Sequence, residues 1–209
     1  MKKIDLFIGA IFVCSAAIFA WTYLKPARAD RVGVPAVEEA AMQEAASRNA
    51  AGWEAFAGGD YKKALSEFQA AREAAAGTEA FSLQGLACSY YQLGDKKATE
   101  KTLASLQKAL QGNNTSSFAE AWVAALNGCG RAGEAQEQAK SLVKTYPESV
   151  RLWATLADAS LYLNDLQGAA EALQAANKFT PDETLSAYLA DLQERLSSHA
   201  DKSSDGTDR

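Results

Sequence analysis

The side chains that most often carry catalysis are scarce in this chain of 209 residues. His199 is the single histidine and lies in a polar stretch near the C-terminus, which argues against a Ser-His-Asp triad, a Cys-His pair and a histidine-based metal site. Neither a G-x-x-x-x-G-K-[ST] loop nor a G-x-G-x-x-G motif after a predicted strand is present. The sequence therefore predicts a protein that is not an enzyme and that uses no cofactor, metal or small-molecule substrate.

Cysteine is the remaining reactive residue type, at Cys14, Cys88 and Cys129. Cys14 falls in an apolar N-terminal segment, where a small lipid-facing residue is the simplest interpretation. Cys88 is expected in the middle of one helix, and Cys129 at the end of a later one, inside a turn. Helices that pack at about 8–10 Å hold such positions too far apart for a disulfide, so we expect two buried thiols.

The amino-acid composition predicts the secondary structure that positions these residues. Alanine accounts for 44 residues, and all four isoleucines (Ile4, Ile8, Ile11 and Ile18) precede residue 19. Between residues 38 and 198 there are only three valines and eight threonines. A sheet needs β-branched and aromatic residues to cover its faces, so the chain is predicted to be all-α.

A pattern of small, large and turn residues recurs along the chain. The residues Gly59, Gly94, Gly130 and Asn164 occupy the same position of this pattern, at spacings of 35, 36 and 34 residues. Alanine or another small residue precedes and follows each turn, at positions where two helices would cross closely. These residues are Gly52, Ala87, Val123 and Ala157 before the turns, and Ala64, Ala135 and Ala169 after them. The second copy departs from the pattern, with Thr99 where the alanine is expected. Larger residues are expected to fill the space between successive pairs, namely Phe68, Leu103, Trp122, Trp153 and Leu173.

Over residues 45–181 this pattern resembles the tetratricopeptide repeat (TPR), a helix–turn–helix unit of about 34 residues. The resemblance implies an all-α, TPR-like α-solenoid of about four repeats, in which each pair of helices buries its apolar face against its neighbours. Residues 182–197, with leucines at helical spacing, are predicted to form a C-terminal capping helix. The repeat domain would then span residues 37–197, between a linker at 25–36 and a disordered tail at 198–209.

An N-terminal hydrophobic helix is expected before the repeats. Residues 6–24 carry no charge and would span roughly 28 Å as a helix, close to the ~30 Å hydrocarbon thickness of a bilayer. Residues 1–24 are therefore interpreted as a membrane anchor of a bacterial inner membrane, with the repeats in the periplasm. Two alternatives stay open, namely a signal peptide cleaved after Ala29, and repeats that face the cytoplasm.

Charge and the resemblance together point to a protein partner. Residues 30–209 carry 17 Lys and Arg against 25 Asp and Glu, a net charge of −8, which disfavours nucleic acid and anionic lipid surfaces. In the TPR family the concave face comes from the first helix of each pair. Transferred by register, the resemblance implies a peptide-binding face of Asn49, Trp53, Phe56, Phe81, Gln84, Tyr91, Glu120, Asn127, Arg151, Asp158 and Tyr162.

The basic clamp by which some TPR proteins hold an acidic C-terminus has no counterpart here. Its positions are occupied by Asn49, Trp53, Gln84, Ser117 and Glu120. The main functional hypothesis is a membrane-tethered scaffold, adaptor or assembly factor that binds a protein segment. The alternatives are a constitutive subunit of a membrane or envelope complex, and a chaperone for apocytochromes or for a translocon, whose layout of one span plus repeats is similar.

Overall fold

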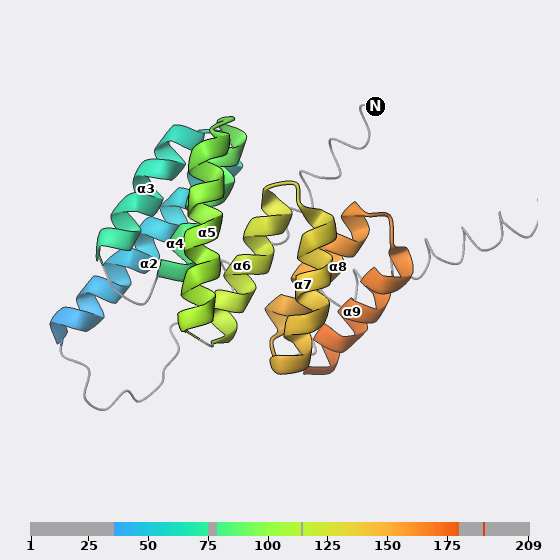
Figure 1. Ribbon diagram of the computed structural model, residues 1–209. Coiled ribbons are helices and arrows are strands. Elements are labelled where there is room, and N and C mark those ends of the chain that lie inside the picture. The colour runs from blue at the N-terminus through green and yellow to red at the C-terminus, as the bar shows by residue number, and fades with distance from the viewer. Residues whose placement is uncertain (1–35, 75–78, 114, 180–189, 191–209) are drawn as a thin grey trace, which may run out of the picture. The chain divides into compact units, whose positions relative to one another are not determined.

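The computed structural model describes residues 36–74, 79–113, 115–179 and 190, and these residues hold eight α-helices and no strand (Figure 1). The helices are α2 (Ala36–Ala57), α3 (Tyr61–Ala74), α4 (Glu79–Gln92), α5 (Lys96–Gly112), α6 (Ser116–Gly128), α7 (Ala132–Thr145), α8 (Val150–Tyr162) and α9 (Leu166–Phe179). The predicted all-α class is confirmed. The hydrophobic N-terminal segment, most of the linker, the predicted capping helix apart from residue 190, and the tail lie outside the described residues.

The helices form two compact units, one containing α2–α5 and the other α6–α9. Within each unit every helix packs against the next one along the chain. In addition, α2 contacts α4 in one unit, and α6 contacts α8 in the other. Each unit is therefore two successive helical hairpins whose first helices touch. We call α2, α4, α6 and α8 the first helices, and α3, α5, α7 and α9 the second helices.

The four predicted turn residues join the two helices of each hairpin, and all four have a left-handed backbone. The φ angle is 80° at Gly59, 76° at Gly94, 75° at Gly130 and 60° at Asn164. Glycine adopts this conformation without a Cβ clash, and asparagine is among the few other residues that tolerate it. The residue after each turn residue donates its backbone N–H to a carbonyl five positions earlier, as in the bonds from Asp60 to Ala55 and from Asp165 to Ser160. This arrangement satisfies carbonyl groups at the end of each first helix.

Three of the four second helices are directly preceded by an aspartate that accepts a backbone hydrogen bond. The carboxylate Oδ1 atoms of Asp60, Asp95 and Asp165 accept from the N–H three residues later, at 3.0, 2.9 and 2.9 Å. This contact satisfies one of the free N–H groups of the first helical turn. Arg131 occupies the fourth position, and its Nε donates instead to Glu134 at 2.9 Å.

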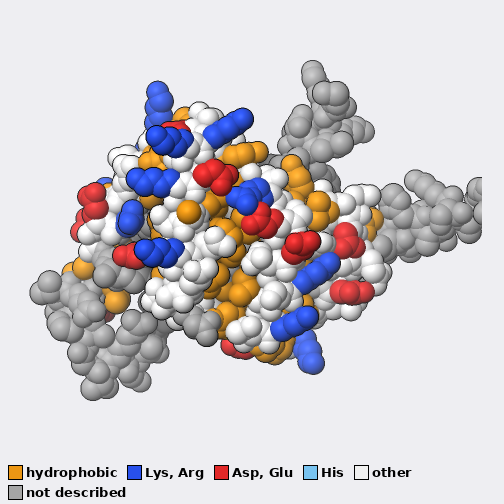
Figure 2. Space-filling view, viewed as in Figure 1, with side chains coloured by type: hydrophobic (Ala, Val, Ile, Leu, Met, Phe, Trp, Pro, Cys, Tyr) orange, Lys and Arg blue, Asp and Glu red, His pale blue; other side chains and the backbone are white. Residues whose placement is uncertain are grey.

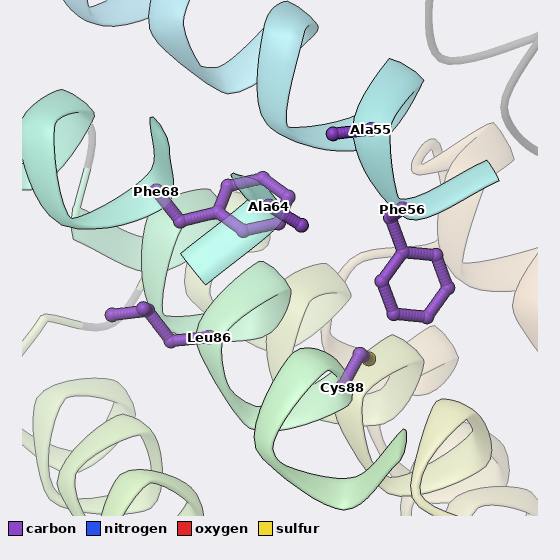
Figure 3. Close-up of a cluster of buried hydrophobic side chains, with 6 residues drawn as sticks. All are labelled: Ala55, Phe56, Ala64, Phe68, Leu86 and Cys88. Atoms are coloured by element: carbon purple, nitrogen blue, oxygen red, sulfur yellow. The ribbon is translucent and has the colours of Figure 1, made fainter. Parts of the chain in front are cut away.

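Phe68 is the centre of the core of the first unit. Its ring is fully buried in a cluster with Ala64 and Leu86 (Figure 3). A Cβ atom added at Gly52 of α2 would lie 2.6 Å from this ring, and one at Gly85 of α4 would lie 2.5 Å from it. The Phe68 ring is thus enclosed by two glycines. A larger residue at either position would prevent α2 or α4 from packing this close to the ring.

The predicted small contact positions are all buried, from Gly52 in α2 to Ala169 in α9. Among the predicted large residues, Phe68, Leu103, Trp122 and Leu173 are at most 3% exposed. Trp153 differs, because it is only half-buried and its indole Nε1 donates to the Pro147 carbonyl at 2.7 Å. Cys88 and Cys129 are buried and are not joined in a disulfide, as predicted.

Candidate functional site

The predicted residues of α2 lie mostly inside the first unit. Asn49 is only 5% exposed, and its side-chain oxygen accepts a hydrogen bond from the Ser82 hydroxyl of α4 at 3.1 Å. Trp53 is half-buried and makes edge-on contacts with the rings of Phe56 and Phe68, at centroid distances of 5.5 and 5.1 Å. Phe56 is itself buried. These three predicted residues therefore join α2 to its neighbours.

Among the predicted residues of α4, only Tyr91 is well exposed. Gln84 is buried and Phe81 is half-buried, whereas 45% of the Tyr91 surface is accessible. Leu93, in the turn that follows α4, is exposed as well. The end of α4 thus offers an aromatic and an aliphatic side chain to a partner.

In the second unit, Glu120 of α6 and Arg151 of α8 belong to one polar group. The Ser149 hydroxyl, at the start of α8, donates to Glu120 Oε1 at 2.7 Å and accepts from the Leu152 N–H at 3.2 Å. Burial raises the pKa of the Glu120 carboxyl, and the Ser149 hydrogen bond and the Arg151 charge oppose that rise. This group ties the two first helices of the unit together.

Asp158, Asn127 and Tyr162 complete the predicted set. Asp158 is half-buried, and burial raises the pKa of its carboxyl to about 7. The side-chain oxygen of Asn127 is enclosed and accepts no hydrogen bond from the described part of the chain. Tyr162, the last residue of α8, is 60% exposed and precedes the exposed Leu163. The end of α8 in the second unit therefore exposes a tyrosine and a leucine, as the end of α4 does in the first unit.

A polar network in the second unit was not anticipated from the sequence. The Gln136 amide of α7 donates to the Ser160 hydroxyl at 3.0 Å and to Asp165 Oδ2 at 2.9 Å. Because Asp165 also caps α9, one side chain of α7 connects α8 with the start of α9. At the equivalent position of the first unit the chain carries Leu65, so only a comparison of the repeats could have indicated this network.

Each unit also has a groove between its two second helices. In the first unit it measures about 540 Å³ and runs between α3 and α5, over α4. In the second unit it measures about 640 Å³ and runs between α7 and α9, over α8. Their floors use equivalent residues, Leu83 and Leu86 in one and Trp153 and Leu156 in the other. Both grooves lie beside second helices, whereas the binding residues were predicted on first helices.

Within residues 36–74, 79–113 and 115–179, no group of three or more His, Cys, Asp or Glu side chains could hold a metal ion. No helix in those ranges is both long and apolar enough to cross a bilayer. The predicted span at 6–24 lies outside the residues that the structure describes.

A scan against protein-family models finds no match, and a search of curated proteins finds none that is similar. The fold and the surface then define the class, which is an all-helical protein of successive helical hairpins.

Proposed function

We propose that this protein is a non-enzymatic, TPR-like scaffold or adaptor that binds a segment of a partner protein on the surface of its first helices. The equivalence of the four turns supports the repeat interpretation. Each turn combines a left-handed residue with the same hydrogen bond back into the first helix. A repeated hairpin that presents its first helices to a partner is how the TPR-like solenoid would act.

The observation that carries the proposal is the position of the exposed apolar side chains. Five large apolar residues are exposed in the described part of the chain, and four of them lie at the C-terminal ends of α4 and α8. Tyr91 and Leu93 lie three and one residues before the turn residue Gly94, and Tyr162 and Leu163 lie two and one residues before the turn residue Asn164. Tyrosine is enriched in protein–protein interfaces because it offers a large rigid contact area and a hydroxyl group.

The proposal includes a membrane tether. The uncharged residues 6–24 would hold the repeats at a bacterial inner membrane, on the periplasmic side, and raise their local concentration near membrane partners. The mass of the mature chain tests the tether, because cleavage after Ala29 would leave Asp30 at the N-terminus.

Substitution of the two exposed tyrosines tests the binding surface. The full chain, purified by affinity from native membranes, is compared with a Tyr91→Ser/Tyr162→Ser variant, and co-purified proteins are identified by mass spectrometry. A Gln107→Ser/Gln138→Ser variant is the matched control, because both glutamines are exposed on second helices. We expect the tyrosine variant to lose the partner with an unchanged melting temperature, while the control keeps it.

A constitutive subunit of a membrane or envelope complex is the alternative function. Such a subunit would be held by its span and by its second helices. A partner that co-purifies in equal amounts with both variants would therefore refute binding through the tyrosines and favour this alternative.

A further inference from the structure

The first unit separates its charges between first and second helices. Its second helices, α3 and α5, carry seven basic and three acidic residues, whereas α2 and α4 carry one basic and five acidic residues. The basic residues are Lys62, Lys63, Arg72, Lys96, Lys97, Lys101 and Lys108, all of them exposed. Figure 2 shows Lys and Arg side chains gathered over the part of the surface where α3 and α5 lie. The net charge of −8 for residues 30–209 therefore does not reveal that α3 and α5 form a basic face.

One of the three acidic residues on the basic face is already paired from the neighbouring helix. Arg48 of α2 lies 3.3 Å from Glu67 of α3 and 3.6 Å from Glu44 of its own helix. This ion pair partly neutralises the carboxylate of Glu67. The positive charge is therefore stronger locally than the count of residues indicates.

The groove of about 540 Å³ lies within this basic face. Arg72 of α3 lines one wall and Lys101 of α5 the other, with Leu83 and Leu86 of α4 between them. Polar groups also line it, from Gln69, Tyr90, Thr102 and Ser105, and Glu73 is its one acidic lining residue. The Gln69 amide donates to the Tyr90 hydroxyl at 3.4 Å. Cationic walls over an apolar floor are complementary to carboxylates on either side of an apolar side chain.

We propose that this groove binds an acidic amphipathic segment of a partner polypeptide. Its carboxylates contact Arg72 and Lys101, and an apolar side chain lies on Leu83 and Leu86. The concave shape favours a polypeptide over a membrane, because a planar surface of lipid headgroups would not reach the floor. This surface is separate from the exposed tyrosines at the ends of α4 and α8, so either can exist without the other.

The equivalent groove of the second unit provides a matched control. Its basic residues Lys140 and Lys144 lie together on the α7 wall, opposite Glu171 of α9 and Asp165, which caps α9. Opposite charges on the two walls give no net preference for an anionic segment. Reversing two basic charges in either groove changes the net charge of the chain by the same amount.

The test measures fluorescence anisotropy of a labelled 12-residue peptide in which glutamates alternate with leucines at helical spacing. The full chain, in detergent micelles, is titrated against this peptide. We expect saturable binding that weakens with added salt, a loss of about tenfold or more for Arg72→Glu/Lys101→Glu, and less than about threefold for Lys140→Glu/Lys144→Glu. An Arg72→Lys variant should retain most of the affinity.

Three outcomes would overturn the proposal. Absence of peptide binding removes the site. Equal losses in the two double variants mean that net charge, and not the groove, attracts the peptide. Binding of the full chain to vesicles containing 30 mol% phosphatidylglycerol that depends on Arg72 and Lys101, with no peptide binding, assigns the basic face to lipid headgroups instead. Circular dichroism of each variant, unchanged from the parent chain, shows that a loss is not caused by unfolding.

Discussion

Substitution of Gly85 by alanine is expected to destabilise the first unit, although alanine is the better helix former. In an exposed helix this change would stabilise by about 1 kcal/mol. At Gly85 the new methyl group would meet the Phe68 ring at 2.5 Å. The ring cannot move away, because Gly52 encloses its other side and Trp53 packs against it at 5.1 Å. Overpacking of this kind costs about 1–3 kcal/mol, and the enclosed ring places it near the upper end. We therefore expect a net loss of about 2 kcal/mol.

Urea unfolding of the full chain, followed by circular dichroism at 222 nm, measures this loss. Gly133→Ala is the control, because Gly133 is also helical and a Cβ atom there would meet nothing within 4 Å. It should be neutral or stabilise by up to about 1 kcal/mol. Gly85→Ala combined with Phe68→Leu should be more stable than the sum of the single changes predicts, by about 1 kcal/mol or more. If Gly85→Ala stabilises as much as Gly133→Ala, Phe68 does not require a glycine there and the reasoning fails.

Three further predictions concern polar groups. Burial raises the pKa of Asp158 to about 7 from 3.8, so ionising this carboxyl destabilises the folded protein. This free-energy cost is absent below pH 4, grows between pH 4 and 7, and reaches at most about 4 kcal/mol above pH 7. Asp158→Asn should therefore raise the melting temperature at pH 8 and leave it almost unchanged at pH 4; equal shifts at both would contradict this assignment. Asp95→Ala removes the hydrogen bond to the first turn of α5 and should cost about 1 kcal/mol in urea unfolding, whereas an unchanged midpoint would show that water replaces the cap. Ser149→Ala removes the hydroxyl that donates to the partly buried Glu120 and should lower stability by about 1–2 kcal/mol at pH 7, an effect that Glu120→Gln should reduce in a double-mutant cycle; additive losses would refute the coupling.

The turns and the close helix contacts could be predicted because their requirements are local. A left-handed turn position favours glycine or asparagine, so Gly59 and Asn164 could be recognised as turn residues from the sequence. Two helices can cross closely only at small residues, so Ala64 and Ala169 could be recognised as helix contact positions from the sequence. Gly85 was not singled out, because the reason for it is the Phe68 ring of another helix.

The accessible face of each first helix could not be assigned from spacing alone. Asn49, Phe56 and Gln84 occupy positions that the family resemblance assigns to the binding face, yet in this protein they are buried. Tyr91 and Tyr162 occupy similar positions and are exposed. The difference depends on which side chains the neighbouring helices bring to each position.

The sequence by itself determined an all-α chain, its helical hairpins and their turns, because backbone conformation and helix propensity act over a few residues. The tertiary structure decided which side chains reach solvent, and it brought Arg72 of α3 and Lys101 of α5 to the two walls of one groove. Burial and charge complementarity are properties of surfaces that several helices build together, so residues distant in the sequence determine them.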